Sequence, residues 1–307
     1  MDEIIKTDKL SKSYKDVNAV DGVSLNVRKG EIYGFLGLNG AGKTTTIRML
    51  LGMIRPTSGT SYLLGKKVDA GNNKIWENVG HLVEPYSYPE LTVRDNLEMF
   101  RRLHNISDKN SVDSVMDKLQ LTAYENRKSK NLSLGNAQRL GLAKAMLHNP
   151  KILILDEPIN GLDPAGIVEV RNLLQDLSMN KGVTVFISSH ILGEVSKLAN
   201  RIGIIHKGKL IQEVNTNKLD GLLNKKLVVN AHNIEAVHKR LVEMGYSVDF
   251  TEDGNLALAD EKALKLPEEI ANILVSSGLP PTLLKTEVED LESYFLRIIG
   301  MKGDNEK

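Results

Sequence analysis

The fold of this chain is decided by residues 37–44, which read Gly37-Leu38-Asn39-Gly40-Ala41-Gly42-Lys43-Thr44. They match the phosphate-binding P-loop pattern in every constrained position. A short apolar run at 31–36 precedes them, as a buried parallel strand would, and 44–51 can open a helix. A strand, a glycine loop and a helix in this order bring backbone N–H groups together at the positive end of a helix dipole. A plain glycine-rich turn would not need these flanks, so the segment predicts a nucleoside triphosphate as ligand.

Individual roles follow from the same pattern. Glycines permit the close approach of backbone to phosphate that a side chain would block. Lys43 is expected to reach the β- and γ-phosphates, and the Thr44 hydroxyl to bind Mg²⁺. The other loop residues expected beside the nucleotide are Asn39, Gly40, Ala41, Gly42 and Thr45.

Composition narrows the class of protein. The 307 residues are 41% hydrophobic and 26% charged, as in globular proteins with a large core. Forty basic residues balance 39 acidic ones, which gives no global field for nucleic acid, and no nucleic-acid partner is expected. Because there is no cysteine, disulfides and thiol chemistry are excluded.

Hydrophobic runs are too short to span a bilayer. The segments 152–155 and 183–187 are strand-sized, far below the roughly 18 apolar residues that a membrane helix needs. The start, 1–6, has neither the basic nor the apolar region of a secretory signal. Any membrane function is therefore expected to require a separate membrane chain.

Two domains are predicted. Residues 1–215 alternate strand-like and helix-like segments, as α/β domains do, and 86–150 are mostly helical with apolar positions three and four apart. After Asn215 the phosphate-type motifs stop, and 216–307 indicate a small α+β domain compatible with a ferredoxin-like arrangement. Its expected elements are a strand at 226–229, a helix at 234–244, strands at 247–250 and 256–258 joined by a two-residue Asp253-Gly254 turn, a helix at 266–276, an extended 280–284 and a helix at 289–299.

A second motif is the apolar run 152–155, which ends in Asp156 and Glu157. Strand alternation sends neighbouring side chains to opposite sides, so the two carboxylates can have different tasks. Asp156 suits the Mg²⁺ site, and Glu157 suits polarising the attacking water. The alternative, acids that cap the turn at Pro158, becomes weak once the P-loop is present.

A third motif is 132–139, Leu-Ser-Leu-Gly-Asn-Ala-Gln-Arg, followed by a helix to Asn149-Pro150. Ser133 and Gly135 at a helix N-terminus would form another anion site. Taken alone, the segment reads better as an ordinary helix cap. Its place shortly before the strand that ends in Asp156 favours the anion site instead.

The ordered motifs resemble the nucleotide-binding subunit of ATP-binding cassette (ABC) transporters over about residues 4–215. In that resemblance 37–44 is Walker A, 152–157 is Walker B, 132–138 is the signature, 161–163 is the D-loop, and 188–190 ends in the switch histidine. The resemblance implies an α/β P-loop NTPase fold with a helical subdomain, ATP and Mg²⁺ as ligands, and ATP hydrolysis.

Three further residues take roles from this resemblance. His190 would contact the γ-phosphate and orient the water with Glu157, although a histidine there could also be a plain surface residue. Tyr14 would stack on adenine, against core packing as the alternative. Asp163 would belong to the D-loop, against a simple turn acid before Pro164.

Two departures from the family pattern stand out. The usual signature is Leu-Ser-Gly-Gly-Gln, whereas Leu134 and Asn136 occupy its third and fifth places here. Glu84 stands where a glutamine usually touches Mg²⁺ and the lytic water; a carboxylate is a good hard ligand but adds negative charge. We therefore expect Glu84 to bind metal and assist catalysis with altered rate or pH dependence. Both departures, with the tail at 291–296, resemble the bacitracin and lantibiotic resistance branch.

The resemblance also implies partners. A second ATP-binding subunit would close its Ser133 and Gly135 on the ATP held by the first, and separate transmembrane permease subunits would receive the motion through the segment after Glu84. Tyr86, Tyr88 and the helix from Thr92 either contact that partner or pack within the helical part. The expected place is the cytoplasmic face of the membrane. A soluble ABC ATPase acting on ribosomes or DNA is the alternative, and a P-loop kinase or GTPase would not explain the signature segment.

Overall fold

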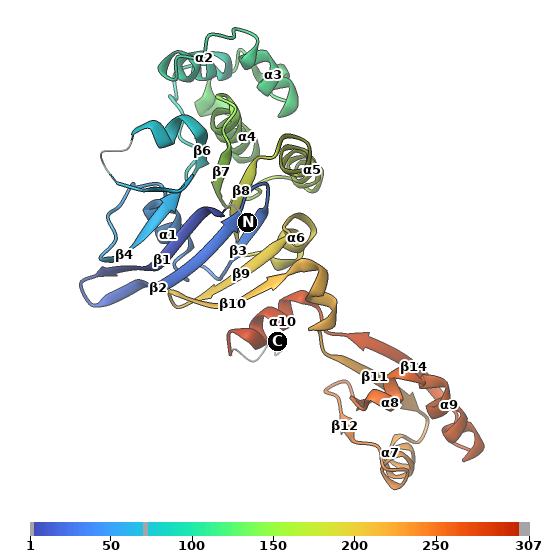
Figure 1. Ribbon diagram of the computed structural model, residues 1–307. Helices are drawn as coiled ribbons and strands as arrows, with labels where there is room; N and C mark the ends of the chain where they lie inside the picture. The colour runs from blue at the N-terminus through green and yellow to red at the C-terminus, as the bar shows by residue number, and fades with distance from the viewer. Residues whose placement is uncertain (1–2, 70–72, 301–307) are drawn as a thin grey trace. The chain divides into compact units, whose positions relative to one another are not determined.

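The computed structural model describes residues 3–69 and 73–300, and its contacts divide the chain into two compact units (Figure 1). The first is Met1–Lys218 and the second Leu219–Lys307, so the division falls inside a short 3₁₀ segment at Thr216–Gly221. The sequence prediction placed the break slightly earlier, after Asn215. The outer limits of the predicted domains, residues 1 and 307, lie outside the described residues.

The first unit contains a six-stranded sheet in the order β10-β9-β3-β8-β7-β6. Only β10 runs antiparallel to its neighbour; the other pairings are parallel. Consecutive apolar residues in the central strands are buried on both faces, as a covered parallel sheet requires. The strands are β3 (Ile32–Leu36), β6 (Val79–Leu82), β7 (Ile152–Asp156), β8 (Thr184–Ser189), β9 (Arg201–His206) and β10 (Lys209–Asn215).

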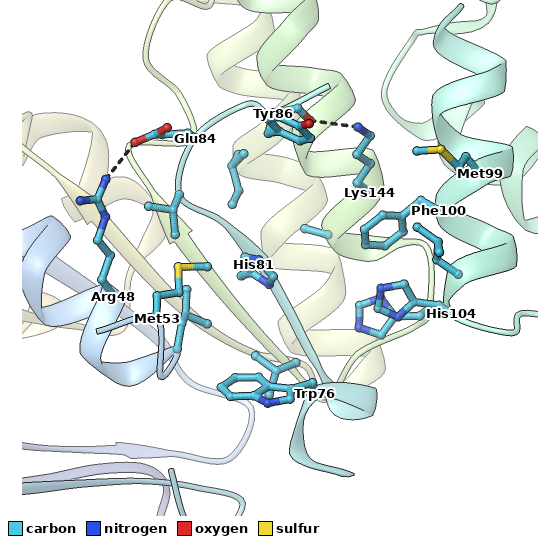
Figure 2. Close-up of a pocket in the computed structure, with 18 of the residues that line it drawn as sticks. Arg48, Met53, Trp76, His81, Glu84, Tyr86, Met99, Phe100, His104 and Lys144 are labelled. Atoms are coloured by element: carbon cyan, nitrogen blue, oxygen red, sulfur yellow. Dashed lines mark hydrogen bonds and ion pairs between the residues drawn. The ribbon is translucent and has the colours of Figure 1, made fainter. Parts of the chain in front are cut away.

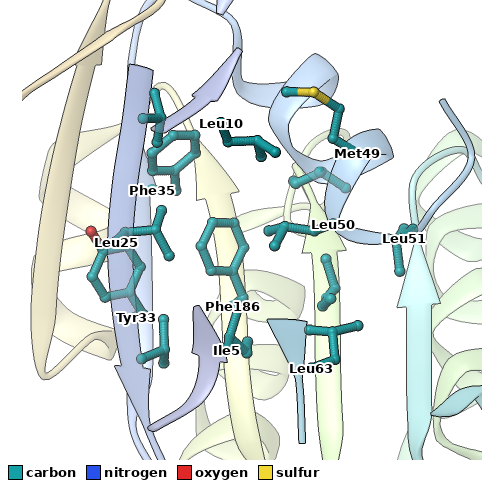
Figure 3. Packing of buried hydrophobic residues seen from close by; sticks show 14 of the residues in the cluster. Ile5, Leu10, Leu25, Tyr33, Phe35, Met49, Leu50, Leu51, Leu63 and Phe186 are labelled. Atoms are coloured by element: carbon teal, nitrogen blue, oxygen red, sulfur yellow. The ribbon is translucent and has the colours of Figure 1, made fainter. Parts of the chain in front are cut away.

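A second, antiparallel sheet of this unit has the order β2-β1-β4-β5. Its strands are β1 (Glu3–Tyr14), β2 (Val17–Arg28), β4 (Ser58–Leu63) and β5 (Lys66–Lys67). The main core lies between the two sheets and includes the helix α1 (Lys43–Leu50), whose Met49 and Leu50 point into it (Figure 3). The Phe186 ring packs 5.5 Å from Tyr33 and 5.4 Å from Phe35, between ring centroids. This packing fixes the strand ends that carry the functional side chains.

The remaining helices of the first unit follow the predicted pattern. Those inside the predicted helical part are α2 (Val93–Leu103), α3 (Ser111–Lys118) and α4 (Leu134–Met146), with short 3₁₀ segments at Thr122–Tyr124 and Ser129–Asn131. A further 3₁₀ segment, Asn73–Asn78, precedes β6 and lies outside that part. Later in the chain come α5 (Pro164–Lys181) and α6 (Leu192–Leu198), which contact each other and the strands β8 and β3 (Figure 1). Within residues 3–69 and 73–300, the helices are all too short or too polar to cross a membrane.

The second unit has the element order βαββααβα, which is the βαββαβ order of ferredoxin-like domains with two helices in the second crossover and one more helix after the last strand. Its antiparallel sheet has the order β12-β13-β11-β14. The elements are β11 (Lys225–Ala231), α7 (Ile234–Glu243), β12 (Val248–Phe250), β13 (Leu256–Leu258), α8 (Glu261–Lys265), α9 (Pro267–Ser276), β14 (Pro281–Val288) and α10 (Leu291–Ile298). Pro267 separates α8 from α9 because its missing N–H suits the first position of a new helix.

The predicted two-residue turn at Asp253-Gly254 is wrong in length, although β12 and β13 do pair. The turn is closed by the Thr251 N–H, which donates to the Asn255 carbonyl at 2.8 Å. A two-residue type I′ turn needs positive φ at both central residues, and only Gly254 has it, with φ 73°. A longer loop that ends in one left-handed glycine forms instead.

Candidate functional site

The loop between β3 and α1 is shaped by backbone that side chains could not follow. Gly42 has φ 108°, and a Cβ placed on it would lie 2.4 Å from the Ala19 carbonyl oxygen. The helix begins at the next residue, so the free N–H groups of its first turn end at this loop. Such a helix start attracts phosphate oxygens. The local geometry therefore fits the predicted triphosphate.

Lys43 is held inside its own loop. Its ammonium donates to the Gly37 carbonyl at 2.6 Å and to the Leu38 carbonyl at 3.3 Å. It also lies 3.2 Å from a Glu157 carboxylate oxygen, and its side chain is only 6% exposed. The ion pair joins the first and second sequence motifs directly, which the motifs themselves did not predict.

Thr44 and Asp156 present adjacent oxygens. The Thr44 hydroxyl donates to Asp156 Oδ2 at 2.7 Å, and the Ser188 hydroxyl donates to the other carboxylate oxygen. Asp156 and Ser188 are register partners at the ends of β7 and β8, since parallel strands bring their carboxyl ends to one edge. A hydroxyl and a carboxylate side by side are hard oxygen ligands, so this donor set fits Mg²⁺. Clusters of three or more His, Asp or Glu suited to a metal are absent from the described residues.

A turn, and not the strand alternation that the sequence argument uses, sets the direction of the Glu157 side chain. β7 ends at Asp156, and Glu157 has φ 48°, in the left-handed region. Its carboxylate lies between Lys43 and His190, with Oε2 2.9 Å from His190 Nδ1. His190 directly follows β8, the strand neighbouring β7. The structure therefore brings together Lys43, Thr44, Asp156, Glu157 and His190.

The signature residues contact a different part of the chain. Ser133 is the N-cap of α4, and its hydroxyl accepts from the Asn136 N–H at 3.3 Å. A Cβ on Gly135 would lie 2.9 Å from the Gly161 carbonyl, so α4 packs closely on the 161–163 loop. Leu134, the departure from the family pattern, is 63% exposed. Ser133 thus has the ordinary capping role within the chain, and its anion-binding role stays a prediction.

Asp163 caps a helix as well. Its carboxylate accepts from the Gly166 N–H at 3.0 Å at the start of α5, with Pro164 as the first helical residue. This is the turn role weighed from the sequence. Its expected contact with nucleotide stays a prediction.

Glu84 follows β6 and pairs with Arg48 of α1, with 2.9 Å between Oε1 and the guanidinium. Its side chain is 75% exposed, so it is accessible to solvent and to metal. The described contacts do not join it to Thr44 or Asp156. The proposed metal and catalytic roles of Glu84 therefore rest on the sequence pattern.

Tyr14 ends β1 and is 48% exposed, which excludes the core-packing alternative. The Lys12 ammonium lies 5.1 Å from its ring centre. This exposed aromatic ring remains available for stacking on a base.

The other residues expected beside the nucleotide differ in exposure. Asn39 and Gly40 are exposed at the loop, whereas Ala41 is buried and Thr45 is half-buried.

A cavity of about 540 Å³ lies among α1, β6, α2 and α4 (Figure 2). The Lys144 ammonium on its wall donates to the Tyr86 carbonyl at 2.9 Å, and burial lowers the Lys144 pKa to about 8. The His104 ring stacks on Phe100 at 4.3 Å and on His148 at 4.9 Å, between ring centroids. Burial, reinforced by His104 and His81, lowers the His148 pKa to about 4. The cavity is thus lined mainly by aromatic and apolar groups. Its histidines are kept neutral.

Two residues beside Glu157 were not assigned a role from the sequence. The Ser188 hydroxyl accepts from the Glu157 N–H at 3.0 Å, and Gln138 Nε2 donates to the Glu157 carbonyl at 2.9 Å. Ser188 directly follows the apolar run 183–187, and Gln138 lies within the signature segment 132–138. Their contact with Glu157 depends on strand order and helix packing, which local sequence does not encode.

Comparisons with known proteins agree with this geometry. A family model described as ABC transporter matches residues 20–160. Bacitracin transport ATP-binding protein BcrA of Bacillus licheniformis is 40% identical over 306 residues, 98% of each chain. Lantibiotic transport ATP-binding protein SrtF of Streptococcus pyogenes is 36% identical over 229 residues, 73% of this chain and 98% of its own. A dimeric ATP-binding cassette in a post-hydrolysis state with ADP and phosphate shares the fold, with TM-score 0.64 and 24% identity over 69% of this chain and 99% of its own.

Proposed function

This chain belongs to the ATP-binding proteins of ABC transporters, and we propose that it powers the export or membrane extraction of an antimicrobial peptide through separate transmembrane subunits. Its reaction is ATP hydrolysis. The catalytic part of this proposal rests on one observation. Five side chains lie together at one edge of the sheet: Lys43, Thr44, Asp156, Glu157 and His190.

In this proposal the phosphate loop, with Lys43, holds the triphosphate, and Tyr14 stacks on the base. Thr44, Asp156 and Glu84 would hold Mg²⁺, which would neutralise phosphate charge. As Lys43 turns to phosphate oxygens it leaves Glu157, whose carboxylate then keeps His190 as its side-chain partner. Glu157 accepts a proton from the attacking water, a contribution of about 10² to 10⁴ in rate.

A complete site requires a second ATP-binding subunit. Ser133 and Gly135 contact their own helix and the 161–163 loop in this chain, and we propose that they face the nucleotide of a partner subunit. The dimeric cassette bound to ADP and phosphate shares the fold of this chain, and a dimer is what this arrangement requires.

The permease contact is proposed at the cavity beside Tyr86. Tyr86 is 69% exposed and Tyr88 41%, so packing within the helical part leaves much of both rings free. The exposed rings and apolar cavity walls suit a partner helix. The subunit would then lie at the cytoplasmic face of the membrane, where ATP is available.

Among antimicrobial peptides, bacitracin is the first candidate. The relative named for bacitracin transport aligns over 98% of this chain and so includes both compact units, whereas the relative named for lantibiotic transport aligns over 73%. The nucleotide-binding residues themselves do not select the cargo. The second unit is therefore the feature that favours bacitracin over a lantibiotic.

Deletion of the gene, complemented by wild-type chain or by Glu157→Gln, tests this function in the source organism. We expect bacitracin sensitivity to rise on deletion and to be reversed by wild type alone, and the tagged chain to co-purify from membranes with a polytopic protein. Unchanged sensitivity to bacitracin and to lantibiotics would contradict the cargo. Purification only with ribosomes or DNA would contradict transport.

A further inference from the structure

The backbone of Glu157 has an unusual conformation for its residue type. Its φ of 48° lies in the left-handed region, which side chains with a Cβ adopt infrequently because of steric strain. The conformation turns the chain sharply after β7. It also directs the carboxylate toward Lys43 and His190. Such a conformation persists where surrounding contacts hold it.

Two side chains hold the peptide groups of Glu157. Ser188 accepts from its N–H at 3.0 Å, and Gln138 Nε2 donates to its carbonyl at 2.9 Å. The carbonyl accepts a second hydrogen bond from the Asn160 N–H at 3.1 Å, which closes the turn. Gln138 is buried on α4 and is the one side chain of that helix bonded to Glu157 among the described contacts.

The same helix carries the signature residues. Ser133 and Gly135 lie at the N-terminus of α4, about one turn before Gln138. Leu134 contacts the 161–163 loop too, since a Cβ on Gly161 would lie 2.5 Å from Leu134 Cδ2. Helix α4 therefore contacts the segment after β7 at two levels, through its first turn and through Gln138. A rigid shift of α4 would move both contacts together.

We propose that Gln138 is a positioning residue for ATP hydrolysis, which holds the Glu157 backbone so that the carboxylate faces the attacking water, and links this alignment to the position of Ser133 and Gly135. The inference rests on the proposed role of Glu157 as general base. It assigns Gln138 no contact with nucleotide or water. Closure of Ser133 and Gly135 on the partner's ATP would then be transmitted through α4 to the Glu157 of the same chain.

The test compares Gln138→Met, which keeps the side-chain length and removes the donor, with Gln175→Met as matched control. Gln175 also donates from Nε2 to a backbone carbonyl, that of Lys197 at 3.1 Å, but lies outside the ATP site. With purified full-length chain we expect Q138M to lower kcat about 10- to 100-fold, as a small misplacement of a catalytic group does, with ATP affinity within about twofold of wild type. Q175M should leave both unchanged.

Gln138→Glu provides a second measurement, the pH dependence of kcat, which would not change if Gln138 only stabilised the fold. Its ionised carboxylate cannot donate to the Glu157 carbonyl, whereas the protonated form can. The ratio of Q138E to wild-type kcat should therefore rise as pH falls from about 8 to about 5.5, since burial raises a carboxyl pKa. The ratio for Q138M should stay flat. If Q138M does not fold, this pH ratio decides, because glutamate has the shape of glutamine.

A double variant separates positioning from damage to the signature helix. Glu157→Gln with Q138M should form the ATP-dependent dimer as E157Q alone does. The proposal is overturned if Q138M has the kcat of Q175M, if ATP affinity and dimer formation fall in proportion to kcat, or if the Q138E ratio is independent of pH. Normal ATPase activity in E157Q would instead defeat the role of Glu157 on which the inference rests.

Discussion

The ammonium of Lys43 lies 3.2 Å from the carboxylate of Glu157, and the two side chains are 6% and 22% exposed. The pair joins the phosphate loop to the end of β7 across 113 intervening residues, numbers 44–156. A largely buried ion pair costs desolvation and is costly to break from one side. Substitutions at its two members should therefore have different and separable effects on nucleotide binding and turnover.

Glu157→Gln should bind ATP without turning it over. The amide keeps the shape and the contact with His190 but cannot accept a water proton, so we expect turnover to fall by about 10² to 10⁴. A persistent ATP-dependent dimer should accumulate, measurable by gel filtration with ATP beside a hydrolysis assay. Glu252→Gln, the same change at an exposed residue of the second unit, should behave as wild type. Normal ATPase activity in E157Q would remove Glu157 from catalysis.

Lys43→Ala should lose nucleotide binding. The change removes a charge-assisted contact to phosphate and leaves Glu157 without its cation, and we expect ATP affinity to fall roughly 10- to 100-fold. Isothermal calorimetry with ATP measures this. Lys6→Ala, which removes an exposed lysine paired with Glu3, is the control and should bind ATP as wild type does. Unchanged affinity in K43A would exclude the phosphate assignment.

Glu84→Gln and Arg48→Met separate a metal ligand from an exposed ion pair. Both variants remove the Arg48–Glu84 ion pair, which at this exposure contributes about 0–1 kcal/mol to stability. Only E84Q removes a carboxylate, so only E84Q should raise the Mg²⁺ concentration needed for half-maximal ATPase activity, by about threefold to tenfold. A magnesium titration of both variants at fixed ATP measures this. Equal titrations for E84Q and R48M would argue against a metal role for Glu84.

The first unit should become less stable as the pH falls, because the cavity histidines have lowered pKa values in the folded state. The folded-state pKa of His148 is lowered to about 4, so between about pH 6.5 and 4 the unfolded chain binds the extra proton and stability decreases as pH falls. Allowing for partial solvent exposure, we expect about 1–2 kcal/mol over this window from His148. The pKa values of His81 and His104 are lowered as well, mainly by burial, and contribute in the same direction.

His148→Phe checks this dependence. Phenylalanine can keep the stack on His104 without titrating, so the variant should lose part of the stability change between pH 6.5 and 4. Urea unfolding followed by fluorescence of Trp76, the single tryptophan and a residue of this cavity, measures the first unit. His232→Phe, in the second unit, should leave the Trp76 transition as in wild type. An unaltered pH dependence in H148F would contradict the assignment.

Local chemistry explains what was predictable from sequence. The P-loop NTPase fold and the ABC family are confirmed, because a strand, a glycine loop and a helix are specified by adjacent residues. The roles of the nucleotide and metal residues stay predictions. Asp253-Gly254 shows where a local signal was insufficient: the dipeptide suited a two-residue turn, but the backbone has positive φ only at Gly254.

The sequence by itself determined the phosphate loop at 37–44, the paired carboxylates after 152–155 and the absence of thiol chemistry, because each depends on residue types at neighbouring positions. Only the tertiary structure decided that Ser188 and Gln138 hold the peptide groups of Glu157 and that Arg48 pairs with Glu84. These contacts join residues 19 to 36 positions apart. They exist because the order β3-β8-β7-β6 and the packing of α4 bring those segments together, and burial across the whole sheet sets that order.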